Sequence, residues 1–174
     1  MLISSAVLSR IDYCNCIFAG LPDFNLDRLP QVMNAAARVI SCRRKYDHIS
    51  DVLQDLHWLW VPQRIEFKLC FMVYKALHNL AQLYLAELCI PVTVVAGRQQ
   101  LCSSSTGNLV VTKPLSEFGK RAFAFAGPHA WNNPPQTIKS STSVAVFKTH
   151  LKTHLFRQCY KLFWFWFFFL LLFA

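Results

Sequence analysis

Apolar residues recur at steps of three and four along much of this chain, the spacing that places them on one face of an α-helix. The clearest case is the segment from about residue 25 to residue 42, whose apolar positions are Leu26, Leu29, Met33, Ala36 or Ala37, and Ile40. Pro30 fits this helix only in its first turn, because deeper in the helix it would cost about 3 kcal/mol. The pattern therefore predicts an amphipathic helix that begins shortly before Pro30.

The same spacing, with suitable capping residues, predicts helices elsewhere in the chain. Gly20 and Pro22 end the first of them, Ser50 is the expected N-cap of a short one, and Pro62 opens a longer one. The predicted helices cover residues 4–19, 51–56, 62–80, 83–89 and 143–160. In the last of these the expected buried face consists of Val144, Phe147, Leu151, Leu155 and Cys159.

The pattern changes between residues 92 and 142. Residues 103–107 read as a loop, while residues 109–111 and 121–126 read as short strands, the latter because Phe123 and Phe125 alternate with alanines. We therefore expect a mainly α protein with a small β insertion. Its expected parts are a helical region (1–91), a loop-rich segment with short strands (92–142), a basic amphipathic helix (143–160) and an apolar tail (161–174).

The excess of positive charge indicates which class of molecule the chain would bind. Lys and Arg outnumber Asp and Glu by 18 to 9, which gives a net charge of +9. Such a balance favours polyanions, either RNA or DNA or an anionic membrane surface. The residues predicted to bind nucleic acid are Arg38, Arg43, Arg44, Lys45, Arg64, Lys68, Lys120, Arg121, Lys148 and Lys152. The alternative is that these cations only solvate helix faces.

Cysteine and histidine spacing argues against a metal site. The seven cysteines include no C-x-x-C pair, and the first residues do not resemble a signal peptide, so we expect reduced thiols and an intracellular, nuclear or cytoplasmic, location. A zinc site at Cys14 and Cys16 lacks a second ligand pair with suitable spacing. His150 and His154 stand four apart, but without a third ligand they are expected to be a solvated pair. We expect no metal, no cofactor and no small-molecule substrate.

Several short blocks occur in an order that resembles the region downstream of the polymerase palm in LINE-type (non-LTR) retrotransposon reverse transcriptases of the jockey and chicken-repeat kind. The blocks are SRIDYCN (9–15), AGLP (19–22), NAAAR (34–38), HI (48–49), LHWL (56–59), RIEFK (64–68), YKALH (74–78), GKRAF (119–123), GP (127–128), WN (131–132) and FKTHLKTHLF (147–156). The resemblance covers about residues 1 to 160.

This resemblance implies a thumb and connector, which in the family help to hold template and primer. Reverse transcription needs carboxylates that bind two Mg²⁺ ions, and the family supplies them from an aromatic-x-Asp-Asp motif. The chain contains no adjacent Asp pair. The resemblance therefore implies a fragment of a transposable-element RNA-directed DNA polymerase that binds nucleic acid without being an enzyme.

Departures from the family pattern indicate a degenerate copy. Cys102 stands where the family usually has Arg, and Trp60 and Gln82 stand where it usually has Pro. We expect such changes to weaken both binding and folding.

Two kinds of side chain have structural alternatives to a functional role. Trp58 and Trp131 could stack on bases, but their apolar neighbours predict core positions. Asp12 and Asp51 are expected to cap helices or form ion pairs, not to bind metal.

The segment 162–174 contains no polar residue. As a helix it would span about 20 Å, short of the roughly 30 Å hydrocarbon core of a bilayer. Its predicted membrane-contacting residues are Leu162, Phe163, Trp164, Phe165, Trp166, Phe167, Phe168, Phe169, Leu170, Leu171, Leu172 and Phe173. Alternatively, translation past a stop codon into U-rich sequence would produce the same run. A small basic membrane-associated protein, tail-anchored or interfacial, and a retroelement-derived open reading frame without function are the alternatives to nucleic-acid binding.

Overall fold

The computed structural model describes residues 2–95 and 106–172, with the backbone alone for Asp23 and for residues 161–172. Regular structure in this described part is helical, apart from an isolated antiparallel bridge between Pro91 and Leu109. The prediction of a mainly α protein is therefore confirmed.

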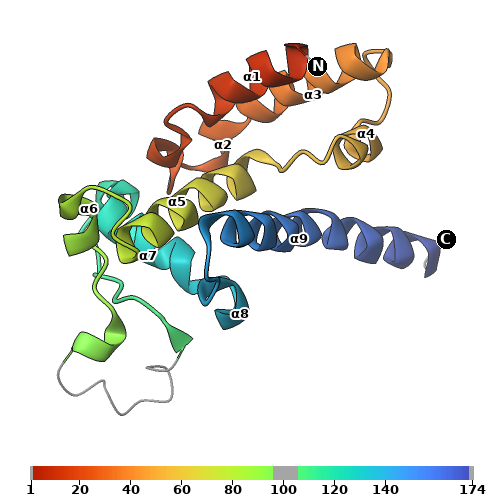
Figure 1. Ribbon diagram of the computed structural model, residues 1–174. Helices are drawn as coiled ribbons and strands as arrows, with labels where there is room; N and C mark the ends of the chain where they lie inside the picture. The colour runs from red at the N-terminus through yellow and green to blue at the C-terminus, as the bar shows by residue number, and fades with distance from the viewer. Residues whose placement is uncertain (1, 96–105, 173–174) are drawn as a thin grey trace. The chain divides into compact units, whose positions relative to one another are not determined.

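The chain forms two compact units. Unit 1 contains Met1–Asn15, Leu21–Arg64 and Thr153–Ala174, and unit 2 contains Cys16–Gly20 and Ile65–Lys152. Two helices, α5 (Val61–Leu77) and α9 (Val144–Leu172), contribute residues to both units. Figure 1 shows the course of the chain through these elements.

Unit 1 begins with α1 (Leu2–Asp12), which lies along α3 (Arg28–Ser41). The predicted helix over 4–19 ends earlier, at Asp12, because Cys14 adopts a left-handed conformation with φ 51°, and the 3₁₀ turn η1 (Asn15–Phe18) follows. The helix predicted over 25–42 is split into α2 (Asp23–Leu26) and α3. Pro30 is in the first turn of α3, as predicted.

The core of unit 1 is completed by α4 (Ser50–Asp55), by the segment leading to α5 and by residues 153–160 of α9. Tyr160 of α9 donates a hydrogen bond of 2.7 Å to the carbonyl oxygen of buried Trp58. Burial, the largest cause, raises the pKa of Tyr160 to about 12. Phe156 of α9 stacks on His57 with ring centroids 5.4 Å apart. Aromatic contacts therefore fix residues 57–60 against this part of α9.

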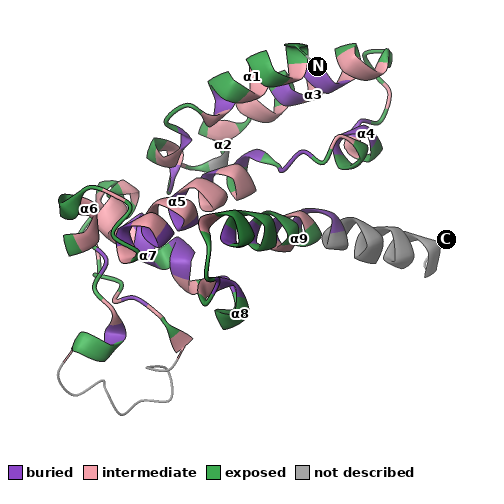
Figure 2. Cartoon of the chain, in the orientation of Figure 1, coloured by how far each residue is buried: buried purple, intermediate pink, exposed green. Residues whose placement is uncertain are grey.

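Unit 2 comprises the rest of α5, the first turns of α9 and the helical elements between them. These elements are α6 (Leu83–Glu87), η2 (Val92–Val94), η4 (Phe118–Arg121), α7 (Phe123–Asn132) and α8 (Gln136–Lys139). Its core is built around Tyr74 of α5, whose ring stacks on Phe147 of α9 at 4.1 Å and whose hydroxyl donates to the carbonyl of Ser141 at 2.9 Å. Figure 2 shows buried residues along α5 and α7.

A glycine allows α7 and α5 to approach closely. A Cβ atom on Gly127 would lie 3.0 Å from the ring of Phe123 and 3.2 Å from a methyl group of Val73 on α5. Both distances are shorter than ordinary van der Waals contacts, so a glycine at this position allows α7 to lie this close to α5.

Both predicted strands are absent as strands. Residues 121–126 belong to η4 and α7, and in the segment 109–111 only Leu109 makes a bridge. The alternation of Phe123 and Phe125 with alanines was too short to separate a period of 2 from one of 3.6. Ala126 and Ala130, four residues apart, are buried on the same helix face. Their burial favours the helical conformation of this segment over a strand.

The boundaries of α4 and α5 differ from the predicted ones by one to three residues. Ser50 is the first residue of α4 instead of its N-cap, which is Ile49. Helix α5 ends at Leu77 instead of Leu80, because Asn79 takes a left-handed conformation with φ 57° and the amide of Leu80 turns back to the carbonyl of Lys75 at 2.8 Å.

Candidate nucleic-acid interface

Two ammonium groups from different helices of unit 2 converge on one aromatic ring. Nζ of Lys75 lies 4.8 Å from the ring centroid of Phe71, and Nζ of Lys148 lies 4.6 Å from the same centroid. The first pair is within α5, whereas Lys148 reaches across from α9. Each such contact contributes about 0.5–1 kcal/mol at an exposed position. The ring thus holds together two cations that would otherwise repel each other.

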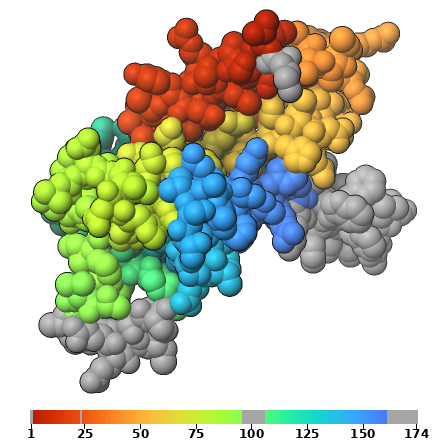
Figure 3. Space-filling model, in the orientation of Figure 1, coloured from red at the N-terminus to blue at the C-terminus, as the bar shows by residue number. Residues whose placement is uncertain are grey.

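Two further lysines extend this pair into a patch. Lys68 precedes Phe71 by three residues on α5, and Lys152 follows Lys148 by four on α9, spacings that put each on the same helix face as its neighbour. We call Lys68, Phe71, Lys75, Lys148 and Lys152 the Phe71 patch. Figure 3 shows the first turns of α9 beside the surface of α5.

No acidic side chain neutralises the patch within the part of the chain that the structure describes. The ion pairs found there involve Arg43, Arg64 and Lys120, and none of the four patch lysines. The carboxylate of Glu66, also on α5, accepts a hydrogen bond from Asn133 at 3.1 Å. Four cations lie on two packed helices, two of them in contact with one ring and none, among the described residues, paired with a carboxylate. Such an arrangement favours a bound polyanion.

Sequence reasoning identified Lys68, Lys148 and Lys152 but missed Lys75 and Phe71. The spacing of Phe71 and Lys75 was a usable signal, since residues four apart on a helix are neighbours. The contact from α9 had no sequence signal, because it depends on how two helices distant in sequence pack together.

A second group of predicted cations lies in unit 1, directly after α3. Arg43, Arg44 and Lys45 are exposed in a turn that begins at the left-handed residue Cys42, with φ 53°. Arg43 lies 3.5 Å from Asp51, and both side chains are about half exposed, so this pair contributes little to stability. Arg38 donates to the carbonyl of Asp47 at 3.4 Å.

Three other predicted cations are engaged in the fold. Arg64 is only 11% exposed; it contacts both carboxylate oxygens of Asp12 at 2.9 Å and donates through Nε to the carbonyl of Leu59. Lys120 pairs with Glu117 at 2.7 Å, and Arg121 donates to the carbonyl of Ile17 at 3.3 Å. Their printed partners belong to the protein itself, so these three cations contribute to the fold. The expectation that Asp12 and Asp51 form ion pairs is confirmed.

The two tryptophans considered for base stacking are core residues, as predicted. Trp58 and Trp131 are buried, and the indole nitrogen of Trp131 donates to the carbonyl of Gly107 at 3.0 Å. On α9, His150 is exposed, while the imidazole of His154 lies 3.2 Å from the side-chain amide of Gln158. Across residues 2–95 and 106–172, no three His, Cys, Asp or Glu side chains are grouped so as to hold a metal.

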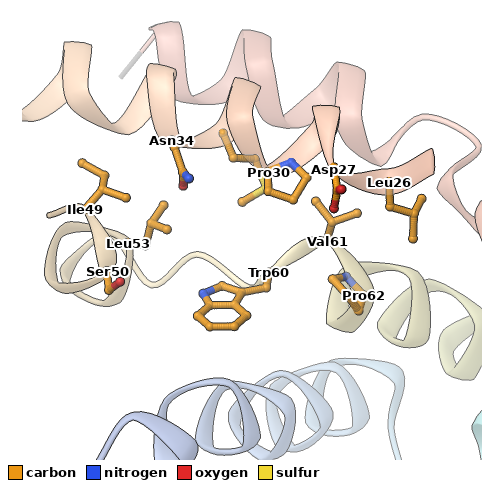
Figure 4. A pocket seen from close by; sticks show the side chains of 11 residues that line it. Leu26, Asp27, Pro30, Asn34, Ile49, Ser50, Leu53, Trp60, Val61 and Pro62 are labelled. Atoms are coloured by element: carbon orange, nitrogen blue, oxygen red, sulfur yellow. The ribbon is translucent and has the colours of Figure 1, made fainter. Parts of the chain in front are cut away.

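Unit 1 contains a cavity of about 480 Å³ that sequence analysis did not predict. Its walls come from α2, α3, α4 and the start of α5, and Figure 4 shows the side chains that line it. Apolar residues such as Leu53 and Val61 form most of the surface, with Asp27, Asn34 and Ser50 among them. Four segments of the chain contribute side chains to the cavity walls, so no local pattern in the sequence could predict it.

The predicted membrane-contacting side chains, residues 162–173, lie outside the described side chains, and Phe173 lies outside the described backbone as well. Helix α9 continues through Leu172. Within the described residues we find no helix with the length and apolar character that crossing a bilayer requires.

Fold and site together define a helical, basic protein with a lysine-rich patch on two packed helices. Comparison of the chain with protein-family models, with curated proteins and with solved structures found no match. The resemblance to LINE-type reverse transcriptases therefore stays a prediction.

Proposed function

We propose that this chain is a non-catalytic nucleic-acid-binding protein that holds RNA or DNA by its phosphates at the Phe71 patch. The observation that carries the proposal is the convergence of Lys75 and Lys148 on one ring, with Lys68 and Lys152 on the adjoining turns. Flexible cations gathered on one surface suit a phosphate backbone, since neutralising each phosphate releases condensed counterions.

Two further features support the proposal. The net charge of +9 attracts polyanions over a longer range than the patch itself. Residues 1–160 resemble the post-palm region of a retrotransposon RNA-directed DNA polymerase, and this resemblance implies a nucleic acid as the ligand. Because no adjacent Asp pair occurs in the sequence, we propose binding without nucleotide addition, in the nucleus or cytoplasm.

The first experiment measures binding of the full chain to fluorescent RNA and DNA oligonucleotides by anisotropy at several salt concentrations. Lys148→Gln combined with Lys152→Gln should weaken binding and reduce the slope of log affinity against log salt by roughly 1 for each phosphate that is no longer neutralised. Both lysines are exposed, so the fold should persist.

The matched control is Lys113→Gln combined with Arg28→Gln. It removes the same charge from exposed positions that are not among the predicted nucleic-acid-binding residues. This control should keep most of the salt slope. Equal losses of affinity in the two double variants would mean that net charge, and not the patch, determines binding. Affinity that is absent at low salt, or that salt does not change, would refute nucleic-acid binding.

A further inference from the structure

The basic turn of unit 1 carries an exposed aromatic ring beside its cations. Tyr46 is 89% exposed, and the ammonium group of Lys45 lies 5.5 Å from its ring centroid. Arg43 and Arg44 precede it, also exposed. The ring therefore lies among cations, with most of its surface open to solvent.

Hydrogen bonds fix the backbone of this turn. The amide of Arg44 donates to the side-chain carboxylate of Asp47 at 2.9 Å, and the amide of Asp47 donates back to the carbonyl of Arg44 at 3.2 Å. The amide of Arg43 donates to the carbonyl of Arg38 at 3.0 Å, and the Arg38 guanidinium donates to the carbonyl of Asp47. Tyr46 thus projects from a backbone that is already ordered, so a ligand would meet a preformed surface.

A purely structural account explains the cations but not the ring. Positive side chains after the last turn of α3 complement the negative end of the helix dipole, and Arg43 also pairs with Asp51. An exposed tyrosine contributes nothing to that electrostatic effect and is not part of the apolar core of unit 1.

Aromatic rings beside cations form the surface that single-stranded nucleic acids use, because bases stack on the ring while the cations contact phosphates. In a duplex, the base faces are stacked on each other and are closed to a side chain from outside. A stacking tyrosine therefore favours single strands over duplexes, a preference that lysines alone do not supply.

We propose that residues 43–46 bind single-stranded RNA or DNA, with one base stacked on Tyr46 and the neighbouring phosphates held by Arg43, Arg44 and Lys45. The inference rests on the proposed function in that the chain must bind nucleic acid at all. It adds a second contact, in unit 1, and a strand preference.

The test compares three probes with the full chain by anisotropy at low salt. They are a 15-nucleotide single strand (as DNA and as RNA), the corresponding DNA duplex, and an abasic DNA strand of the same length that keeps the phosphates but has no base faces. Tyr46→Leu should weaken binding to the base-containing single strands roughly tenfold. Affinity for the duplex and for the abasic strand should change less than about twofold, since phosphate contacts remain.

Two further variants separate stacking from other effects. Tyr46→Phe keeps the ring and should bind single strands like the unchanged protein. Tyr84→Leu removes a second exposed tyrosine, 63% exposed on α6 of unit 2, and should leave single-strand binding unchanged. Circular dichroism of each variant checks that the helices persist.

The outcomes distinguish this proposal from the previous one. Salt-dependent binding that Tyr46→Leu does not alter, or alters equally for the abasic strand, overturns the stacking role and leaves binding at the Phe71 patch standing. Loss of binding in Tyr46→Phe also overturns it, because the ring is kept. If none of the probes binds, both proposals fail.

Discussion

Single charged residues in this protein have different roles that depend on how deeply they are placed. Arg64 and Arg43 each face one carboxylate, but Arg64 is 11% exposed whereas Arg43 is 47% exposed. When a shielded guanidinium loses its carboxylate, its charge stays away from water without a compensating partner, which lowers stability. An exposed guanidinium is then solvated by water, so little stability is lost. The same residue type is therefore structural in one place and available to a ligand in another.

Asp12→Asn should consequently lower the free energy of unfolding by about 2 kcal/mol. The value lies below that for a fully buried pair because Asp12 itself is 43% exposed. Asp51→Asn, which breaks the exposed pair with Arg43, should change the free energy of unfolding by less than about 0.5 kcal/mol. Urea unfolding of both variants checks the difference, and similar decreases in the two would show that the Arg64 contact has no special structural role.

At the level of helices, packing contacts determine whether a segment is helical where its sequence pattern fits both a helix and a strand. The buried face of α9 was predicted correctly at Phe147, Leu151, Leu155 and Cys159, whereas Val144 is only half-buried. Its long, regular spacing contained enough repeats to define the period. The alternation in 121–126 did not, and the correct assignment depends on the approach of α7 to α5 at Gly127, a contact between segments more than 50 residues apart.

Gly127→Ala tests this approach. Alanine favours a helix over glycine by about 1 kcal/mol, but its methyl group would press on Phe123 and on buried Val73, and overpacking costs about 1–3 kcal/mol. We expect a net destabilisation of about 1 kcal/mol in denaturant unfolding. In a Val73→Ala background the methyl group gains space, so the added cost of Gly127→Ala should shrink. A stabilised single variant would contradict the close packing.

The candidate site was predictable in part, for a physical reason. Composition and charge runs are local, so Arg43, Arg44 and Lys45 and the lysines of α9 could be identified from sequence. Whether a cation is neutralised, as Arg64 is by Asp12 52 residues away, depends on tertiary contacts. The contact of both Lys75 and Lys148 with Phe71 likewise depends on tertiary packing.

For the molecule as a whole, the net charge of +9 has opposite effects on folding and on binding. Self-repulsion destabilises a compact basic chain, and salt screens it within about 10 Å at 0.1 M. Salt also weakens attraction to phosphates.

Raising NaCl from about 20 to 200 mM should therefore raise the thermal midpoint of the free protein by a few degrees while lowering its affinity for RNA. Circular dichroism melting and anisotropy on the same sample check the two directions. A midpoint that falls with salt would indicate that attractive ion pairs outweigh self-repulsion.

The contact between Phe71 and Lys148 also has a temporal consequence. Lys148 follows Phe71 by 77 residues, so a growing polypeptide on the ribosome carries the ring long before the second ammonium group exists. Translation intermediates that stop short of α9 would contain Phe71 and Lys75 without Lys148, so the Phe71 patch would be complete only late in synthesis.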